Sequence, residues 1–165
     1  MGLDQEKALD QLKGGKYLTF SLGEEEYGIN VLKIKEIIGM MPITSVPRTP
    51  EFVKGVANLR GKIIPVIDLR LKLGLEARAY DDMTCIIVVE VQRSSGSIKM
   101  GIVVDKVSEV MSISVDQIED TPTFGVKLET QYMLGMAKTG DQINILIDID
   151  RVVSAEDIAA LDEVV

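Results

Sequence analysis

The side chains that most often carry enzymatic chemistry are scarce in this sequence. There is no His among the 165 residues, and the single Cys is Cys85. The absence of His excludes a His phosphorelay, nucleophiles activated by His and the commonest zinc sites. Because Cys85 lies in an apolar run, we expect it to be a buried small hydrophobic residue rather than a nucleophile.

Carboxylates and glycines give two further patterns, and neither predicts a catalytic site. Asp148 and Asp150 alternate near Asp141, but no base or metal ligand accompanies them, so solvated strand ends and turns explain them better. The segment from Gly55 departs from a phosphate-binding loop, because five residues separate its glycines and Ile63 stands where a magnesium-binding Ser or Thr is needed. We therefore expect no enzyme activity, no cofactor and no metal site.

Arg60 is a candidate binding residue of another kind, because Arg is enriched in protein interfaces. It precedes Gly61 in a predicted turn, where an Arg stays solvated, pairs with a local acid or contacts a partner. Glu36 and Glu109 interrupt otherwise apolar strands, either as guards against edge-to-edge aggregation or as partner contacts. The residue types alone leave these alternatives open.

Internal repeats indicate which part of the Arg60 region is scaffold. Residues 52–70 recur eighty positions later, and 28–38 recur as 101–111, so one supersecondary unit is used twice. The first echo pairs Phe52, Gly55, Val56, Ala57, Ile67 and Asp68 with Tyr132, Gly135, Met136, Ala137, Ile147 and Asp148. The stretch Asn58-Leu59-Arg60-Gly61 does not recur; its counterpart is Lys138-Thr139-Gly140-Asp141. We interpret the repeated residues as scaffold and the unrepeated turn as functional.

The elements that must position these residues are mostly short strands. Apolar alternation predicts a hairpin from residue 17 onward, strands at 61–68, 85–91 and 143–149, and a hairpin loop at 92–99. Short helices are predicted at 50–53 and 69–73. Pro65 lacks a backbone donor, so we expect it at an edge or a bulge. About ten short strands and little helix predict an all-β pair of small barrels.

The domain plan that follows is a flexible leader at 1–15, one domain at 16–154 and a C-terminal helix at 154–165. Within the domain we place a first subdomain at about 16–80 and a second at about 81–150, with exchange of strands between them left open.

Composition narrows the class of partner. The chain is 46% hydrophobic and 27% charged, which is typical of a soluble globular protein. A net charge of −8 argues against nucleic acid or an anionic membrane, because both require a basic surface. The longest uncharged apolar run, residues 85–89, is far below the roughly 20 residues of a membrane helix. We expect a cytoplasmic protein that does not insert into the membrane.

Taken together, these patterns resemble the CheW family of bacterial chemotaxis coupling proteins. The motifs that carry the resemblance span residues 16–154 and read FSLGEEEYGINVLKIKEI, TPEFVKGVANLRGKIIPVIDLR, MGIVVDKVSEV and YMLGMAKTGDQINILIDIDRVV. The resemblance implies two five-stranded SH3-like barrels packed on a common hydrophobic core. A small-ligand-binding or catalytic β-barrel protein is the alternative.

The resemblance also implies a non-enzymatic adaptor. Such an adaptor joins the cytoplasmic tips of methyl-accepting chemoreceptors to the regulatory domain of the histidine kinase CheA, and is recruited to membrane receptor arrays. That kinase domain shares the fold, so it and further copies of the adaptor can alternate in rings. Carried over by motif, the receptor-binding groove between the subdomains involves Ile34, Glu36, Gly55, Asn58, Arg60 and Val110. The kinase-binding residues are expected to be Met83, Thr84 and Cys85.

Overall fold

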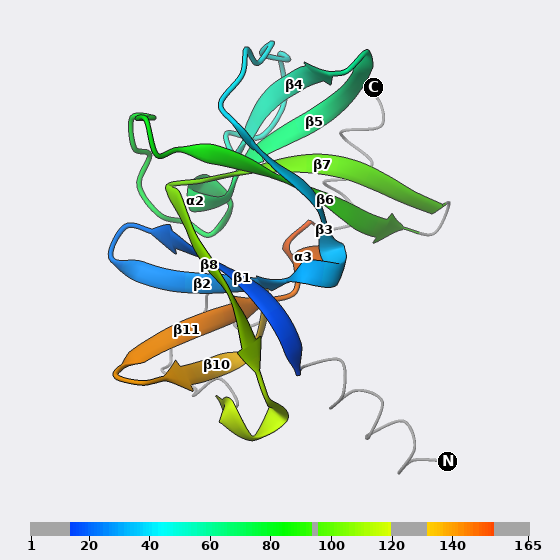
Figure 1. The fold of residues 1–165 in the computed structure, drawn as a ribbon. Helices are drawn as coiled ribbons and strands as arrows, with labels where there is room; N and C mark the ends of the chain where they lie inside the picture. The colour runs from blue at the N-terminus through cyan, green and yellow to red at the C-terminus, as the bar shows by residue number, and fades with distance from the viewer. Residues whose placement is uncertain (1–13, 94–95, 120–131, 154–165) are drawn as a thin grey trace.

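The computed structural model describes residues 14–93, 96–119 and 132–153. These residues form two mixed β-sheets in which most strand pairs are antiparallel (Figure 1). Sheet A has the order β8 (Lys106–Ile113), β1 (Gly15–Leu22), β2 (Glu25–Asn30), β11 (Gln142–Ile147), β10 (Met133–Thr139) and β9 (Ile118–Glu119). Sheet B has the order β3 (Ile34–Gly39), β6 (Cys85–Arg93), β7 (Gly96–Val104), β5 (Lys62–Asp68) and β4 (Val53–Leu59). Single helical turns lie at η1 (Val31–Lys33), α2 (Leu69–Lys72), η2 (Val115–Gln117) and α3 (Ile149–Val152).

The two sheets exchange one strand each. β3 follows β2 of sheet A along the chain, but it pairs with β6 in sheet B. β8 follows β7 of sheet B, but it pairs with β1 in sheet A. In Figure 1 these two strands run from one layer to the other. A cut of the chain near residue 80 therefore separates strands that belong to the same sheet.

The hairpins β4–β5 and β10–β11 have the same register eighty residues apart, which confirms the internal repeat. Val53 pairs with Ile67 and Met133 with Ile147, and each hairpin has its register shift at the same place. The parallel pairing of each hairpin with a third strand is also equivalent, because Ile67 faces Ile102. In sheet A the corresponding partner of Ile147 is Ile29.

Each repeated hairpin ends in a capping aspartate. Asp68 accepts a hydrogen bond from the Arg70 amide at 2.9 Å and so begins α2. Asp148 begins α3 in the same way, accepting from the Asp150 amide at 3.0 Å. A short side-chain acceptor at this position satisfies a helix N–H that has no backbone partner. The motif's two aspartates are thus explained by local backbone geometry.

A common hydrophobic core joins the sheets, as the family resemblance implied. The cluster includes Phe20 and Ile29 of sheet A together with Ile87 and Ile102 of sheet B, all fully buried. β6 is buried on both faces, because Ile87 belongs to this core while Val88 packs in a second cluster within sheet B. Burial on both faces explains why β6 is a continuous apolar run rather than an alternating one.

Several sequence predictions about local structure were wrong. Residues 50–53 form no helix; the Val53 amide donates to the Pro50 carbonyl at 3.0 Å, and β4 begins there. The segment pairs with the end of β5 instead of forming a helix, because the Phe52 carbonyl accepts a hydrogen bond from the Asp68 amide at 2.8 Å. The predicted hairpin loop at 92–99 is shorter, since β6 continues to Arg93 and β7 starts at Gly96. The leader and the C-terminal helix lie outside the described residues, apart from residues 14–15 at the leader's end.

The all-β fold is confirmed, with one difference in strand number. Sheet A has six strands rather than five because the two-residue strand β9 pairs with Met136 and Ala137. In sheet B the equivalent place is taken by an isolated bridge between Thr44 and Val56. Within the described ranges, no helix is long and apolar enough to cross a membrane.

Pro65 occupies an interior strand rather than the predicted edge or bulge. Its partner Val56 directs both backbone groups to Thr44, at 2.8 and 2.9 Å, so the backbone nitrogen of Pro65 faces β7 instead of β4. The pairing of β5 with β7 begins only at Val66. The missing N–H therefore removes no ladder hydrogen bond, which is the condition for proline in a strand.

Candidate partner-binding surfaces

Arg60 and Glu36 form an ion pair at the end of sheet B. Arg60 sits in the β4–β5 turn, and its Nη1 donates to Glu36 Oε2 on β3 at 2.8 Å. The Arg60 side chain is 71% exposed, whereas that of Glu36 is 29% exposed. Because β3 and β4 stand at opposite ends of the strand order, this contact shows that sheet B curls until its edges approach.

The turn that carries Arg60 holds this residue in an unfavourable backbone conformation. Arg60 has φ of 52°, a left-handed conformation that side chains other than Gly seldom adopt. Asn58 stabilises the turn, because its Oδ1 accepts a hydrogen bond from the Gly61 amide at 2.8 Å. The equivalent residue in the second hairpin is Gly140, with φ of 65°. The fold therefore accepts Gly here, and an Arg is not required by backbone geometry.

The pair is electrostatically coupled. The hydrogen bond from Arg60 lowers the pKa of Glu36, more than its partial desolvation raises it, and Lys99 lowers it further. The same hydrogen bond raises the pKa of Arg60. The other Glu36 oxygen, Oε1, is shielded from solvent and has no hydrogen-bond partner among the described residues. Both groups therefore stay charged across the neutral range, with the Arg60 guanidinium hydrogen-bonded to the Glu36 carboxylate.

Aliphatic side chains accompany the ion pair. Ile38 lies on the same face of β3 as Glu36 and packs against the second cluster of sheet B, whereas Ile34, beyond a register shift in β3, packs against the common core. Ile37 is 45% exposed on the other face, and Ile63, beside the turn, is 57% exposed. The surface beside the Arg60 turn thus combines a cation with the accessible apolar side chain of Ile63.

Two predicted receptor-binding residues lie apart from this pair. Gly55 is buried, and a Cβ added to it would come within 1.9 Å of the Thr44 carbonyl oxygen. Its contribution is close backbone approach rather than a side-chain surface. Val110 is 56% exposed and lies on β8, at the edge of sheet A rather than in sheet B. The structure therefore brings together Glu36, Asn58 and Arg60, while Ile34 packs against the common core, Gly55 lies against Thr44 and Val110 lies in the other sheet.

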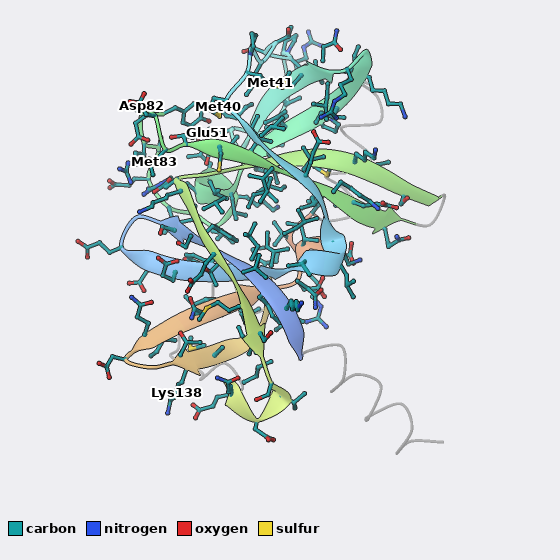
Figure 2. The ribbon with its side chains drawn as sticks, viewed as in Figure 1. Met40, Met41, Glu51, Asp82, Met83 and Lys138 are labelled. Atoms are coloured by element: carbon teal, nitrogen blue, oxygen red, sulfur yellow. The ribbon has the colours of Figure 1, made fainter. Side chains whose placement is uncertain are left out.

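The three predicted kinase-binding residues differ in exposure. Met83 is 55% exposed, and Figure 2 shows it with Asp82 at one side of the molecule. Thr84 is buried, and its hydroxyl accepts a hydrogen bond from the Asp81 amide at 2.9 Å. Cys85 is half-buried at the start of β6, and burial raises the pKa of its thiol. Of the three, Met83 alone offers a large side-chain surface to a partner.

An ionic cluster around Asp105 was not predicted from the sequence. The Asp105 carboxylate accepts from Arg70 Nε and Nη2, both at 2.7 Å, from the Gly23 amide at 2.7 Å and from Arg78 Nη1 at 2.9 Å. The side chains of Asp105 and Arg70 are only 11% and 13% exposed. The sequence contained one signal of this cluster. When residues 28–38 are aligned with their repeat at 101–111, the apolar Leu32 corresponds to the charged Asp105.

The remaining carboxylates have structural roles. Asp148 caps α3, and Asp150 binds Lys33 Nζ at 2.6 Å and the Gln92 amide at 3.0 Å. Across residues 14–93, 96–119 and 132–153, no group of three or more His, Cys, Asp or Glu side chains could hold a metal ion.

Comparisons with known proteins agree with this geometry. Residues 16–157 match the model of the CheW-like domain. The chain is 43% identical to the chemotaxis protein CheW of Klebsiella aerogenes, over 96% of this chain and 93% of that protein. It is 34% identical to the chemotaxis protein CheW of Thermotoga maritima, over 87% and 91% of the two chains.

A solved structure supports the same assignment. The scaffolding protein TtCheW from Thermoanaerobacter tengcongensis superposes with a TM-score of 0.77 at 38% identity, covering 87% of this chain and 95% of that one. The two-sheet fold, the repeated hairpins and these matches together show that the chain belongs to the CheW family of chemotaxis scaffold proteins, which are not enzymes.

Proposed function

We propose that this protein couples chemoreceptors to a histidine kinase in a chemotaxis array. In this proposal the turn of Arg60 binds the cytoplasmic tip of a methyl-accepting receptor, and the region of Met83 binds the regulatory domain of the kinase CheA. The protein then works in the cytoplasm at membrane receptor arrays, where further copies of it can share the rings. The observation that carries the proposal is the Arg60–Glu36 pair, which holds a cation on an exposed turn.

Arg60 has the properties of an interface anchor. The fold accepts Gly at the equivalent turn position, so the Arg accepts a backbone cost of about 1 kcal/mol that packing does not require. Glu36 contacts one guanidinium nitrogen of a side chain that is 71% exposed, which leaves donors directed at solvent. An Arg that is already held in place loses less side-chain entropy on binding. The exposed Ile63, which pairs with Asn58 beside the turn, adds apolar area for a helical partner.

The kinase surface is formed by different elements. Met83 precedes β6, whereas Arg60 lies between β4 and β5. Methionine adapts its shape to an apolar partner pocket because its side chain is unbranched and flexible. Separate elements for the two contacts support simultaneous binding of receptor and kinase, which is what a coupling protein needs.

The test uses Arg60→Glu. We expect the free energy of unfolding to stay within about 1 kcal/mol of wild type, because the pair is solvent-exposed. Binding of a receptor hairpin fragment should weaken at least about tenfold, since two acids would face the partner in place of a held cation. Calorimetric titration with the receptor fragment, and separately with the kinase regulatory domain, measures both affinities.

Lys62→Glu is the matched control, because it makes the same charge change on an exposed residue of the same hairpin. It should alter receptor affinity much less, and neither variant should alter kinase affinity. A lowered melting temperature with unchanged receptor binding in Arg60→Glu would refute the assignment.

A further inference from the structure

The segment of residues 75–84, here the 75–84 loop, connects α2 to β6 without helix or strand. It carries three exposed large apolar side chains, with Leu75 37%, Tyr80 40% and Met83 55% exposed. Loops that present apolar groups usually lose conformational entropy when they bind, which weakens the complex. Hydrogen bonds that hold such a loop in the free protein reduce that loss.

Hydrogen bonds attach the first part of the 75–84 loop to the fold. At its start the Leu75 amide donates to the Arg70 carbonyl at 2.8 Å, and Arg70 Nη1 donates to the Glu76 carbonyl at 3.0 Å. In the middle the Tyr80 hydroxyl donates to the buried Asp68 at 2.9 Å. These bonds fix residues 75–80, but none of them reaches Met83.

The Met83 end depends on Asp81. Asp81 Oδ1 accepts from the Met83 amide at 2.8 Å and from the Thr84 amide at 3.2 Å, so it sets the backbone that carries the Met83 side chain. These hydrogen bonds, with that of the Met83 amide contributing most, lower the pKa of Asp81. The Asp81 side chain itself is half-exposed, and the Asp81 amide donates to the hydroxyl of the buried Thr84 at 2.9 Å.

Arg78 adds an attachment for the Asp81 carboxylate. Its Nη1 donates to Asp105 Oδ2 at 2.9 Å, and its Nη2 lies 3.5 Å from Asp81 Oδ2. One guanidinium therefore connects a carboxylate buried between the sheets to the carboxylate that orients Met83. A recess of about 300 Å³ adjoins this bridge, and it is lined by Arg78, Asp81 and Met83 of the loop together with Gly23 and Asp105.

We propose that Arg78 is a positioning residue for kinase binding: by bridging Asp105 and Asp81 it holds Met83 over this recess in the orientation that the kinase domain contacts. The inference rests on the proposed function, which assigns Met83 to the kinase. Arg78 acts through Met83 and need not touch the partner. Without the bridge, Asp81 to Met83 can shift across the recess while Tyr80 and Arg70 still hold the first part of the loop.

Isothermal calorimetry with the kinase regulatory domain tests the proposal on the full chain. Arg78→Ala should weaken binding about three- to tenfold, the range expected when one or two side chains must be ordered on binding. Arg78→Lys should recover only part of the loss, because a single ammonium cannot contact two carboxylates as a guanidinium does. In a Met83→Ala background the Arg78→Ala change should cost less than about twofold, since an orienting residue has nothing left to orient.

Two further measurements separate positioning from other roles. Hydrogen exchange at the Met83 and Thr84 amides of the unbound protein should accelerate in Arg78→Ala, while affinity for the receptor fragment stays at the wild-type value. Equal losses with and without Met83, or unchanged amide exchange, would overturn the proposal in favour of a direct Arg78 contact. If the wild-type chain does not bind the kinase domain, the proposed function fails as well. If it binds and Arg78→Ala binds equally well, the inference alone fails.

Discussion

Asp105→Asn is expected to lower the free energy of unfolding by about 3–5 kcal/mol, the range found when one member of a buried ion pair is removed. The carboxylate accepts four hydrogen bonds, two of them from Arg70, whose side chain is 13% exposed. Asn has nearly the same shape, but its amide nitrogen would face donors and Arg70 would lose its charged partner. Asp105 joins β7, α2 and the β1–β2 turn, so the damage reaches both sheets.

Urea denaturation followed by circular dichroism measures this loss. Glu119→Gln is the control, because the Glu119–Lys138 pair is more than 60% exposed on both sides. We expect the control to cost less than about 1 kcal/mol. Similar small losses in both variants would show that the Asp105 cluster contributes little to stability.

Acid should reduce the contribution of Asp105. Burial raises the pKa of this carboxyl, but the hydrogen bonds from Arg70 and the Gly23 amide lower it by more, so the folded value lies below the usual one. The unfolded chain therefore takes up the proton first, near pH 4 (roughly the unperturbed value), and stability falls as the pH drops through the folded pKa. The difference in unfolding free energy between wild type and Asp105→Asn should be constant at neutral pH and shrink below about pH 4. An unchanged difference down to about pH 2 would contradict the lowered pKa.

Gly55→Ala is the second substitution with a large expected effect, a loss of about 2–5 kcal/mol from combined steric overlap and backbone strain. The new Cβ would lie 1.9 Å from the Thr44 carbonyl oxygen, and Gly55 has φ of 139°. Because the obstacle is backbone, the strand segment at Thr44 must move. That movement breaks the pair of hydrogen bonds, at 2.8 and 2.9 Å, between Thr44 and Val56.

Gly140→Ala measures the cost of a left-handed conformation where the new Cβ meets no neighbour. Gly140 also has a positive φ, of 65°, but a Cβ there would have nothing within 4 Å. Its cost should be near 1 kcal/mol, that of the left-handed conformation alone. Thermal unfolding of both variants is the measurement. Equal shifts in melting temperature would show that the contact with Thr44 is unimportant.

Much of the local structure was predictable from the sequence because it depends on neighbours in the chain. The repeat placed Asp68 and Asp148 in the same setting, and the structure gives both the same capping role. The apolar run that begins at Cys85 indicated a strand, and β6 is one. The exchange of β3 and β8 was not predictable, because periodicity shows which residues share a face but not which sheet receives the strand.

The candidate site was predictable in part for the same reason. Motif resemblance named Arg60 and Glu36. Their contact was not predictable, because it brings the β4–β5 turn to β3 at the opposite end of the strand order, and local sequence patterns do not encode such a contact. Gly55 was predicted by motif to belong to the receptor-binding groove, but its close approach to Thr44 depends on a contact that the sequence does not mark. Asp105, Arg70 and Arg78 were missed because each is an ordinary charged residue until the fold brings them together.

The strand exchange between sheets also determines how the chain can be divided and how it must fold. A fragment ending near residue 80 would contain β1 without β8 and β3 without β6, leaving unpaired edges on both halves. We expect neither half to be stable alone, although the two halves carry the same repeated hairpin. Pairing β1 with β8 closes a loop of roughly ninety residues, so these late contacts make folding slow for a chain of this size. We therefore expect the two copies of the repeat to unfold together as one cooperative unit, because each sheet needs strands from both halves of the chain.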